Sequence, residues 1–135
     1  MRKRQLKLDN YGISDKRVKE LSGFCEQYPD WKVFLANNVN TLRSKKIDGM
    51  PYSNTGRTSD QTASLAIKRA EIQSKVDLIE STAKEASPEL WEYIIKSVCY
   101  EMPYWYIRDI MNAPIGRSLF YDTRRYFFWL LDKKR

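Results

Sequence analysis

Histidine is absent from this 135-residue sequence, and glycine and cysteine are scarce. Without histidine the chain has no Cys2His2 zinc site and no histidine general base. Five unclustered glycines argue against a phosphate-cradling loop and against a fold with many tight β-turns. Cys25 and Cys99 belong to no ligand-spaced cluster, so we interpret both as small buried hydrophobic residues. No disulfide framework is predicted, which favours a reducing cytoplasm.

Long apolar runs are also missing. No window approaches the roughly 20 apolar residues that a membrane-spanning helix needs. The basic segment at residues 1–7 has no apolar stretch behind it, so it does not predict a secretory signal. We therefore expect a cytoplasmic protein with no membrane partner.

Positive charge is in excess, with 24 Lys and Arg against 17 Asp and Glu and a net charge of +7. The excess lies at the two ends, because residues 1–20 and residues 112–135 each carry a net +4, whereas the middle carries a net −1. A basic balance of this kind favours a polyanionic partner such as nucleic acid.

Hydrophobic residues make up 42% of the chain and recur at spacings of three and four, which predicts an all-α fold. Ser14 is a candidate cap for a first helix that runs to about Gln27, and Pro29 breaks the chain before a second helix at about 30–43. The predicted parts are a flexible basic arm at 1–13, an N-terminal helical pair at 14–44, a linker at 45–58, and a region at 59–135 that holds a long helix and a C-terminal helix-turn-helix.

The long helix carries a heptad-like apolar stripe. A stripe of this length is typical of a helix that faces a protein core, and it is also compatible with a coiled coil that forms a homodimer. Both interpretations stay open at this point. The stripe consists of Leu65, Ile72, Val76, Ile79 and Ala83.

The C-terminal third contains strong helix boundaries. Ser87-Pro88-Glu89 predicts a helix over 88–100, and Pro103 predicts a short helix that continues through Met111. A last helix is expected from Ile115 or Gly116 to Asp132. The short helix and the last helix together are typical of a helix-turn-helix, in which the second helix enters the major groove of DNA.

The outward side chains of the last helix are the candidate DNA contacts. With Phe120 and Phe127 pointing inward, the other faces carry side chains that bind phosphates or base edges, and Asp122 is expected to turn toward Arg117 or Arg125. A solvated basic face with no ligand is the alternative. The predicted DNA-binding residues are Arg117, Ser118, Tyr121, Arg124 and Arg125.

Four features along the chain recur in a known order. They are Tyr28-Pro29 with Trp31 and Leu35, the linker end Thr58-Ser59-Asp60, the helix with Ile72, Lys75, Ile79 and Glu80, and the run Phe120-Tyr121-Asp122-Thr123-Arg124-Arg125-Tyr126-Phe127-Phe128 with Leu130. With these features in view, the chain resembles the RinA/ArpU group of phage-encoded late transcription regulators over roughly residues 15–131. The resemblance implies a regulator of phage or prophage genes in a bacterial host cell, with double-stranded DNA as partner and RNA polymerase as a candidate second partner. It places the five residues above in the recognition helix.

Three other classes compete with the regulator. A phage DNA-packaging component such as a small terminase subunit also combines a helix-turn-helix with an oligomerising helix, but it forms rings. An enzyme is not expected, because the acidic residues are scattered, and we predict no catalytic residue, no metal site and no cofactor. A peripheral membrane protein with a basic aromatic C-terminus is less favoured, because the aromatic residues are better used in the core.

Overall fold

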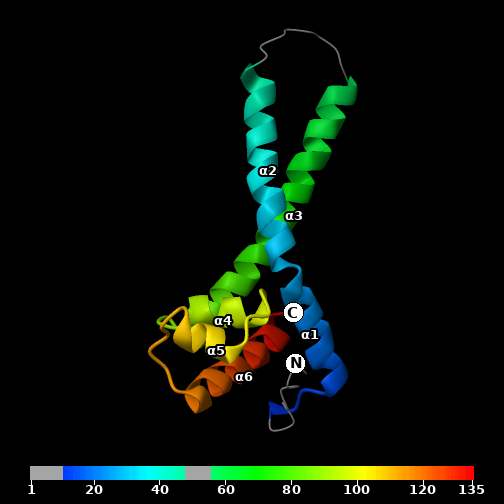
Figure 1. The fold of residues 1–135 in the computed structure, drawn as a ribbon. Helices are drawn as coiled ribbons and strands as arrows, with labels where there is room; N and C mark the ends of the chain where they lie inside the picture. The colour runs from blue at the N-terminus through cyan, green and yellow to red at the C-terminus, as the bar shows by residue number, and fades with distance from the viewer. Residues whose placement is uncertain (1–10, 48–55) are drawn as a thin grey trace. The chain divides into compact units, whose positions relative to one another are not determined.

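The computed structural model describes the backbone of residues 11–47 and 56–135, and the side chains of residues 11–37 and 60–135 (Figure 1). Within these residues the chain forms six α-helices and no strand, which confirms the expected all-α fold. The helices are α1 (Asp15–Glu26), α2 (Tyr28–Ile47), α3 (Gly56–Ala86), α4 (Trp91–Val98), α5 (Tyr104–Asp109) and α6 (Arg117–Lys134).

Helix α1 starts where the sequence predicts. The Ser14 side chain accepts a hydrogen bond from the Arg17 backbone N–H at 3.3 Å, as an N-cap does. Gln27 is the C-cap, and α2 begins at the next residue rather than at residue 30. Pro29 therefore lies in the first turn of α2, where its missing N–H would have no helical partner.

The chain divides into two compact units. Residues 1–28 and 78–135 form the first, called here the terminal unit, and residues 29–77 form the second, called the hairpin unit. Helix α3 contributes its first part to the hairpin unit and its last part to the terminal unit.

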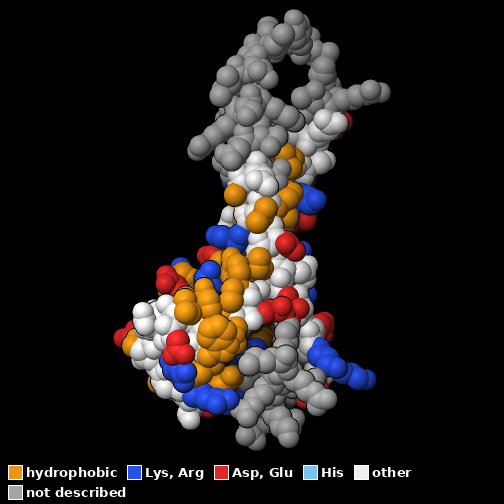
Figure 2. All heavy atoms as spheres, viewed as in Figure 1, with side chains coloured by type: hydrophobic (Ala, Val, Ile, Leu, Met, Phe, Trp, Pro, Cys, Tyr) orange, Lys and Arg blue, Asp and Glu red, His pale blue; other side chains and the backbone are white. Residues whose placement is uncertain are grey.

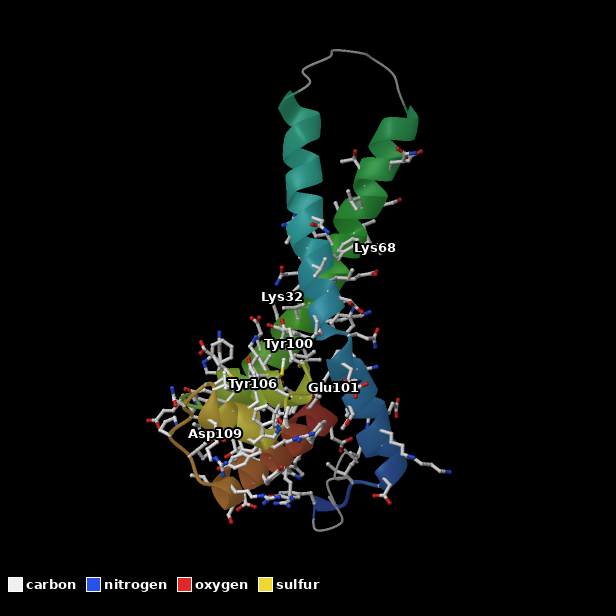
Figure 3. All side chains as sticks on the ribbon, viewed as in Figure 1. Lys32, Lys68, Tyr100, Glu101, Tyr106 and Asp109 are labelled. Carbon is white, nitrogen blue, oxygen red and sulfur yellow. The ribbon has the colours of Figure 1, made fainter. Side chains whose placement is uncertain are left out.

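The hairpin unit consists of α2 and the first part of α3. Trp31 and Leu35 are buried on α2, and Ile72 and Val76 are buried on α3. The Lys75 ammonium group lies 5.5 Å from the centroid of the Trp31 ring. The Lys68 ammonium group, labelled in Figure 3, lies 5.1 Å from the centroid of the Phe34 ring. Cation–π contacts of this kind join two helices without burying the charge.

The expected grouping of residues 14–44 as a helical pair differs from the observed one. Helix α1 belongs to the terminal unit, whereas α2 belongs to the hairpin unit and pairs with α3. The physical reason lies in the buried faces. Leu21 and Cys25 of α1 are fully buried in a unit whose other helices are α4, α5, α6 and the end of α3.

The expected arm and linker also differ in their bounds. Residues 1–10 of the arm lie outside the described residues, but Ile13 is buried and is part of the terminal unit's core. Of the expected linker, residues 48–55 lie outside the described residues. Residues 45–47 are the last of α2 and residues 56–58 are the first of α3.

The apolar stripe of α3 faces the protein interior. Ile72, Val76, Ile79 and Ala83 are all buried, and Leu65 is half-buried. Since the chain's own units cover the stripe from Ile72 onward, the core-facing interpretation is confirmed for that part. The stripe therefore supplies no separate evidence for a homodimer.

The core of the terminal unit is rich in aromatic and branched side chains. Helix α6 packs against α1 and α4, and α4 also packs against α1 and α5. Arg17 Nε on α1 lies 2.7 Å from Asp132 Oδ1 on α6, so an ion pair ties the two helices together at the edge of the core. The fully buried apolar side chains of this unit are Leu21, Cys25, Ile79, Ala83, Ile94, Ile107, Phe120, Phe127, Phe128 and Leu131.

Candidate nucleic-acid interface

The C-terminal region contains a short helix, a turn and a longer helix in direct succession. Helix α5 begins after Pro103, whose carbonyl accepts a hydrogen bond from the Tyr106 N–H at 3.1 Å. Figure 3 labels Tyr106 and Asp109 on this helix, with Asp109 at its C-terminal end. Residues 110–116 follow as the turn, and α6 then runs for 18 residues. The predicted order of elements is therefore present.

The turn is held in one conformation by the backbone of α5. Asn112 adopts a left-handed conformation with φ of 54°. The N–H of Ala113 donates to the carbonyl of Ile107 at 3.1 Å, and both of these side chains are buried. Glycine or asparagine takes such a left-handed position at the end of a helix at least cost. Asn112 thus adopts the left-handed conformation that glycine commonly adopts in other helix-to-helix turns.

The hydroxyl of Tyr104 adds a second tie between α5 and the start of α6. Tyr104 Oη donates to the carbonyl of Ile115 at 3.1 Å. The same ring lies 5.4 Å from the Phe120 ring and 6.1 Å from the Tyr121 ring, measured between centroids. The bracing helix and the first turns of α6 are therefore locked by aromatic packing and by one hydrogen bond.

Helix α6 starts at Arg117, which settles the start that the sequence placed at Ile115 or Gly116. Gly116 is the N-cap, and its lack of a side chain leaves the first turn without a side-chain cap. The first turn also contains no acidic residue. The free N–H groups and the helix dipole therefore give this end of α6 a partial positive charge.

The inner face of α6 is apolar, as predicted. Phe120, Phe127, Phe128 and Leu131 are each 0% exposed. They recur at spacings of seven, one and three, which keeps them on one side of a helix with 3.6 residues per turn. The inward direction of Phe120 and Phe127 is confirmed.

Arg124 is directed toward this inner face and is half-buried with a buried Nε, which differs from the outward position predicted for it. It follows Phe120 by four positions and precedes Phe127 by three, and such neighbours share a face. Arg124 Nη1 donates to Ser97 Oγ of α4 at 3.2 Å. Its Nε is buried and has no hydrogen-bond partner among the described residues. Burial lowers the pKa of the Arg124 guanidinium from its ordinary value, because desolvation disfavours the charged form.

The other four predicted residues are exposed or half-buried. Arg117 and Ser118 are exposed, and Tyr121 and Arg125 are half-buried. Arg117 Cζ lies 5.8 Å from the centroid of the Tyr121 ring, so the ring supports the guanidinium without neutralising it. The structure thus brings Arg117, Ser118 and Tyr121 together in the first two turns of α6, with Arg125 one turn further on.

Asp122 turns toward Arg125, one of the two directions expected for it. Arg125 Nη1 lies 2.8 Å from Asp122 Oδ1, in an ion pair between residues three positions apart. Arg117, by contrast, forms no ion pair within the described part of the chain. Among these outward arginines, Arg117 is therefore the one whose charge is not offset by a carboxylate.

Sequence reasoning missed several residues beside this surface. Arg108 Cζ of α5 lies 5.7 Å from the Tyr104 ring centroid, and Arg108 Nε donates to Asp109 Oδ1 at 2.8 Å. This hydrogen bond lowers the pKa of the Asp109 carboxyl. Leu119 and Tyr126 of α6 are 60% and 38% exposed. Leu119 precedes Phe120 by one residue and Tyr126 precedes Phe127 by one residue. These positions in the sequence predict that both side chains lie beside the core.

The surface of the terminal unit mixes apolar and basic side chains. Figure 2 shows hydrophobic side chains gathered on one face of this unit over α4 and α5, with basic side chains at the edge of the patch. Lys84 and Lys96 contribute to such mixing, because their ammonium groups lie 4.7 Å and 4.2 Å from the ring centroids of Trp91 and Tyr100.

Other kinds of site find little support in the described residues. No three or more Cys, Asp or Glu side chains come together there in a way that could hold a metal ion. Cys25 and Cys99 are both buried with free thiols, which confirms their interpretation. A hydrogen bond with Cys25 and burial raise the pKa of the Cys99 thiol. None of the described helices is both long enough and apolar enough to cross a membrane.

Comparison of the chain with protein-family models, with curated proteins and with solved structures found no match. Fold and site by themselves define an all-α protein in which a short helix and an ordered turn hold a longer helix against the core. What that longer helix does is argued from its outward side chains.

Proposed function

We propose that this protein is a sequence-specific DNA-binding transcriptional regulator in which α5 and α6 act as a helix-turn-helix. One observation carries the proposal. Helix α6 is anchored on one side by the buried Phe120 and Phe127, while Ser118, Tyr121 and Arg125 lie toward its other side and Arg117 is exposed in its first turn. A helix fixed from behind with polar and basic residues in front is what the major groove of B-DNA accommodates.

The bracing arrangement supports the same function. In a helix-turn-helix the first helix holds the second at a fixed angle, and the N-terminal residues of the second contact base edges. Here the hydrogen bond from Tyr104 to Ile115 and the left-handed Asn112 fix the start of α6 relative to α5. The partial positive charge at that start favours a nearby phosphate group.

Charge gives each outward residue a distinct role. Arg117, which has no ion pair within the described residues, supplies the main attraction to phosphate. Ser118 and Tyr121 offer hydroxyl groups to phosphates or base edges. Arg125 is shared with Asp122 and is suited to a directed contact with guanine.

The resemblance of the sequence to the RinA/ArpU group supports a more specific proposal. It points to regulation of phage or prophage genes, namely late, packaging or autolysin genes, in a bacterial host. RNA polymerase is then the natural protein partner. Measurement of mass in solution separates this proposal from a packaging component, because a regulator is a monomer or dimer and a small terminase subunit forms a ring.

Duplex binding by the full chain is the direct test. Fluorescence anisotropy with a labelled random-sequence duplex should show binding that weakens as salt rises, because phosphate contacts release counterions. Arg117→Ala and Arg125→Ala should weaken binding, whereas Lys68→Ala, which removes an exposed positive charge in the hairpin unit, should not. Equal binding by all three variants would reject the proposal. Selection of bound duplexes from a random pool then tests sequence specificity.

A further inference from the structure

Asp122 occupies a special place on α6. The helix turns by about 100° per residue, so a residue two positions from Phe120 lies on nearly the opposite side. Asp122 and Ser118 are the two residues at that spacing, and both are exposed. The side chain of Asp122 is 67% exposed. In a helix-turn-helix complex this outermost line of the helix approaches the floor of the groove.

The two flanks of that line differ in chemistry. Arg117, Tyr121 and Arg125 follow one flank, at about 60°, 100° and 140° from Phe120. Leu119 and Tyr126 follow the other flank, at about 260° and 240°. The basic flank attracts the phosphate groups on one side of the groove, and the Asp122 carboxylate lies between the two flanks. Asp122 is therefore directed at base edges rather than at a phosphate wall.

A carboxylate has few partners on the groove floor. It accepts hydrogen bonds only, so it can bind the N4 amino group of cytosine or the N6 amino group of adenine. Adenine also presents its N7 acceptor beside N6, which repels a carboxylate. A C·G pair presents the O6 and N7 acceptors of guanine beside the cytosine donor, and an arginine satisfies these acceptors.

The ion pair of Asp122 with Arg125 matches this pattern of donor and acceptors. Arg125 Nη1 lies 2.8 Å from Asp122 Oδ1, and the remaining N–H groups of its guanidinium are available to a second acceptor. Resting on the proposed function, we propose that Asp122, held by Arg125, selects a C·G base pair. Asp122 accepts from cytosine N4 while Arg125 donates to guanine.

The same carboxylate acts against other sequences. At a base pair that presents no amino group to Asp122, the carboxylate either stays close to acceptor atoms of the bases or moves away and loses its contact with Arg125. Either outcome lowers the affinity for that sequence. Specificity is thus obtained at the expense of general attraction to DNA. Removal of the carboxylate should strengthen binding to random duplexes and weaken discrimination at one base pair.

The test compares the sites that the wild-type chain and three variants of it select from a pool of random duplexes. The wild type should enrich one invariant C·G pair. Asp122→Ala should lose that preference, and Asp122→Asn should change it toward A·T, because an amide binds both N6 and N7 of adenine. Asp109→Asn is the matched control, since it removes one exposed carboxylate that is also paired with an arginine, on α5. It should leave the preference unchanged.

A competition measurement gives the size of the effect. Duplexes that differ only at the selected pair should be discriminated by the wild type by a factor of about ten. Asp122→Ala should bring that factor close to one. Circular dichroism and thermal melting confirm folding, and Asp122→Ser provides a second small variant if one of the others does not fold.

The outcomes separate this inference from the proposed function. Binding by the wild type with an unchanged base preference in all folded Asp122 variants overturns the role of Asp122 and leaves DNA binding intact. Absence of duplex binding by the folded wild type overturns the proposed function itself. Loss of preference in the Asp122 variants, but not in Asp109→Asn, supports both.

Discussion

The inner and outer faces of α6 show how one helix serves stability and recognition at once. The inner face carries Phe120 and Phe127, which are fully buried, and the outer face carries exposed polar side chains. Arg124 and Arg125 are neighbours in the sequence, yet Arg124 donates to the buried Ser97 of α4 and Arg125 pairs with the exposed Asp122. Charge alone therefore does not indicate that a residue binds a ligand. The position of the residue around and along the helix determines whether its charged group is accessible.

The largest difference between the two faces of α6 is expected in the free energy of unfolding, when a buried side chain is removed and leaves a cavity. Phe127→Ala removes a fully buried aromatic side chain and should lower the free energy of unfolding by about 3–5 kcal/mol. Leu119→Ala on the same helix removes a side chain that is 60% exposed, and it should change the free energy of unfolding by less than about 0.5 kcal/mol. Urea unfolding of both variants measures the difference, and similar losses would show that the faces are wrongly assigned.

The next effect contrasts the exposed Arg117 with the half-buried Arg124. Arg117→Ala should reduce the affinity for duplex DNA about tenfold and lower the slope of log K against log salt by about 1, since one phosphate contact is lost. Arg124→Met should leave both the affinity and the slope unchanged. Anisotropy titrations over a range of salt concentrations measure these quantities. The contrast would be refuted by a larger loss in Arg124→Met than in Arg117→Ala.

A smaller effect concerns the turn that orients the outer face. Asn112→Val should lower the free energy of unfolding by about 1–2 kcal/mol, because a β-branched residue resists the left-handed conformation found there. Asn112→Gly should change it by less than about 0.5 kcal/mol. Thermal melts of the two variants provide the measurement. Equal stability of the valine and glycine variants would show that the turn does not need a left-handed residue.

The smallest effect is expected at Arg124, whose Nε is buried. Within the described part of the chain, Arg124 has a buried Nε without a hydrogen-bond partner, and Ser97 rather than a carboxylate accepts from its Nη1. Arg124→Met keeps the bulk and removes the desolvated charge, so the free energy of unfolding should stay within about 1 kcal/mol of wild type or rise. Arg124→Ala, which also leaves a cavity, should be less stable than Arg124→Met. A loss of several kcal/mol in Arg124→Met, measured by urea unfolding, would contradict this account.

Local features of the fold could be predicted from the sequence because they depend on neighbouring residues. The cap at Ser14 and the inward direction of Phe120 and Phe127 follow from hydrogen-bonding geometry and helical periodicity. The division of the chain could not be predicted in the same way. An apolar face shows that a helix is buried but does not identify its partner, so the sequence does not reveal that α2 pairs with α3 rather than with α1.

The candidate site shows the same limit. Arg117 and Arg124 are seven positions apart and lie on nearly the same side of α6. The sequence does not show how far the core extends along the helix, and α4 covers Arg124 but leaves Arg117 exposed. The tie from Tyr104 to Ile115 was likewise beyond prediction, because it depends on how α5 is placed against the turn.

The central claim is that the outer face of α6 binds duplex DNA. Backbone amide NMR of the full chain, recorded as duplex DNA is added, tests it most directly. The expected result is that the largest shift changes occur at Arg117, Ser118, Tyr121, Asp122 and Arg125, with little change in the hairpin unit. Shift changes confined to the hairpin unit, or none at saturating duplex, would contradict the claim.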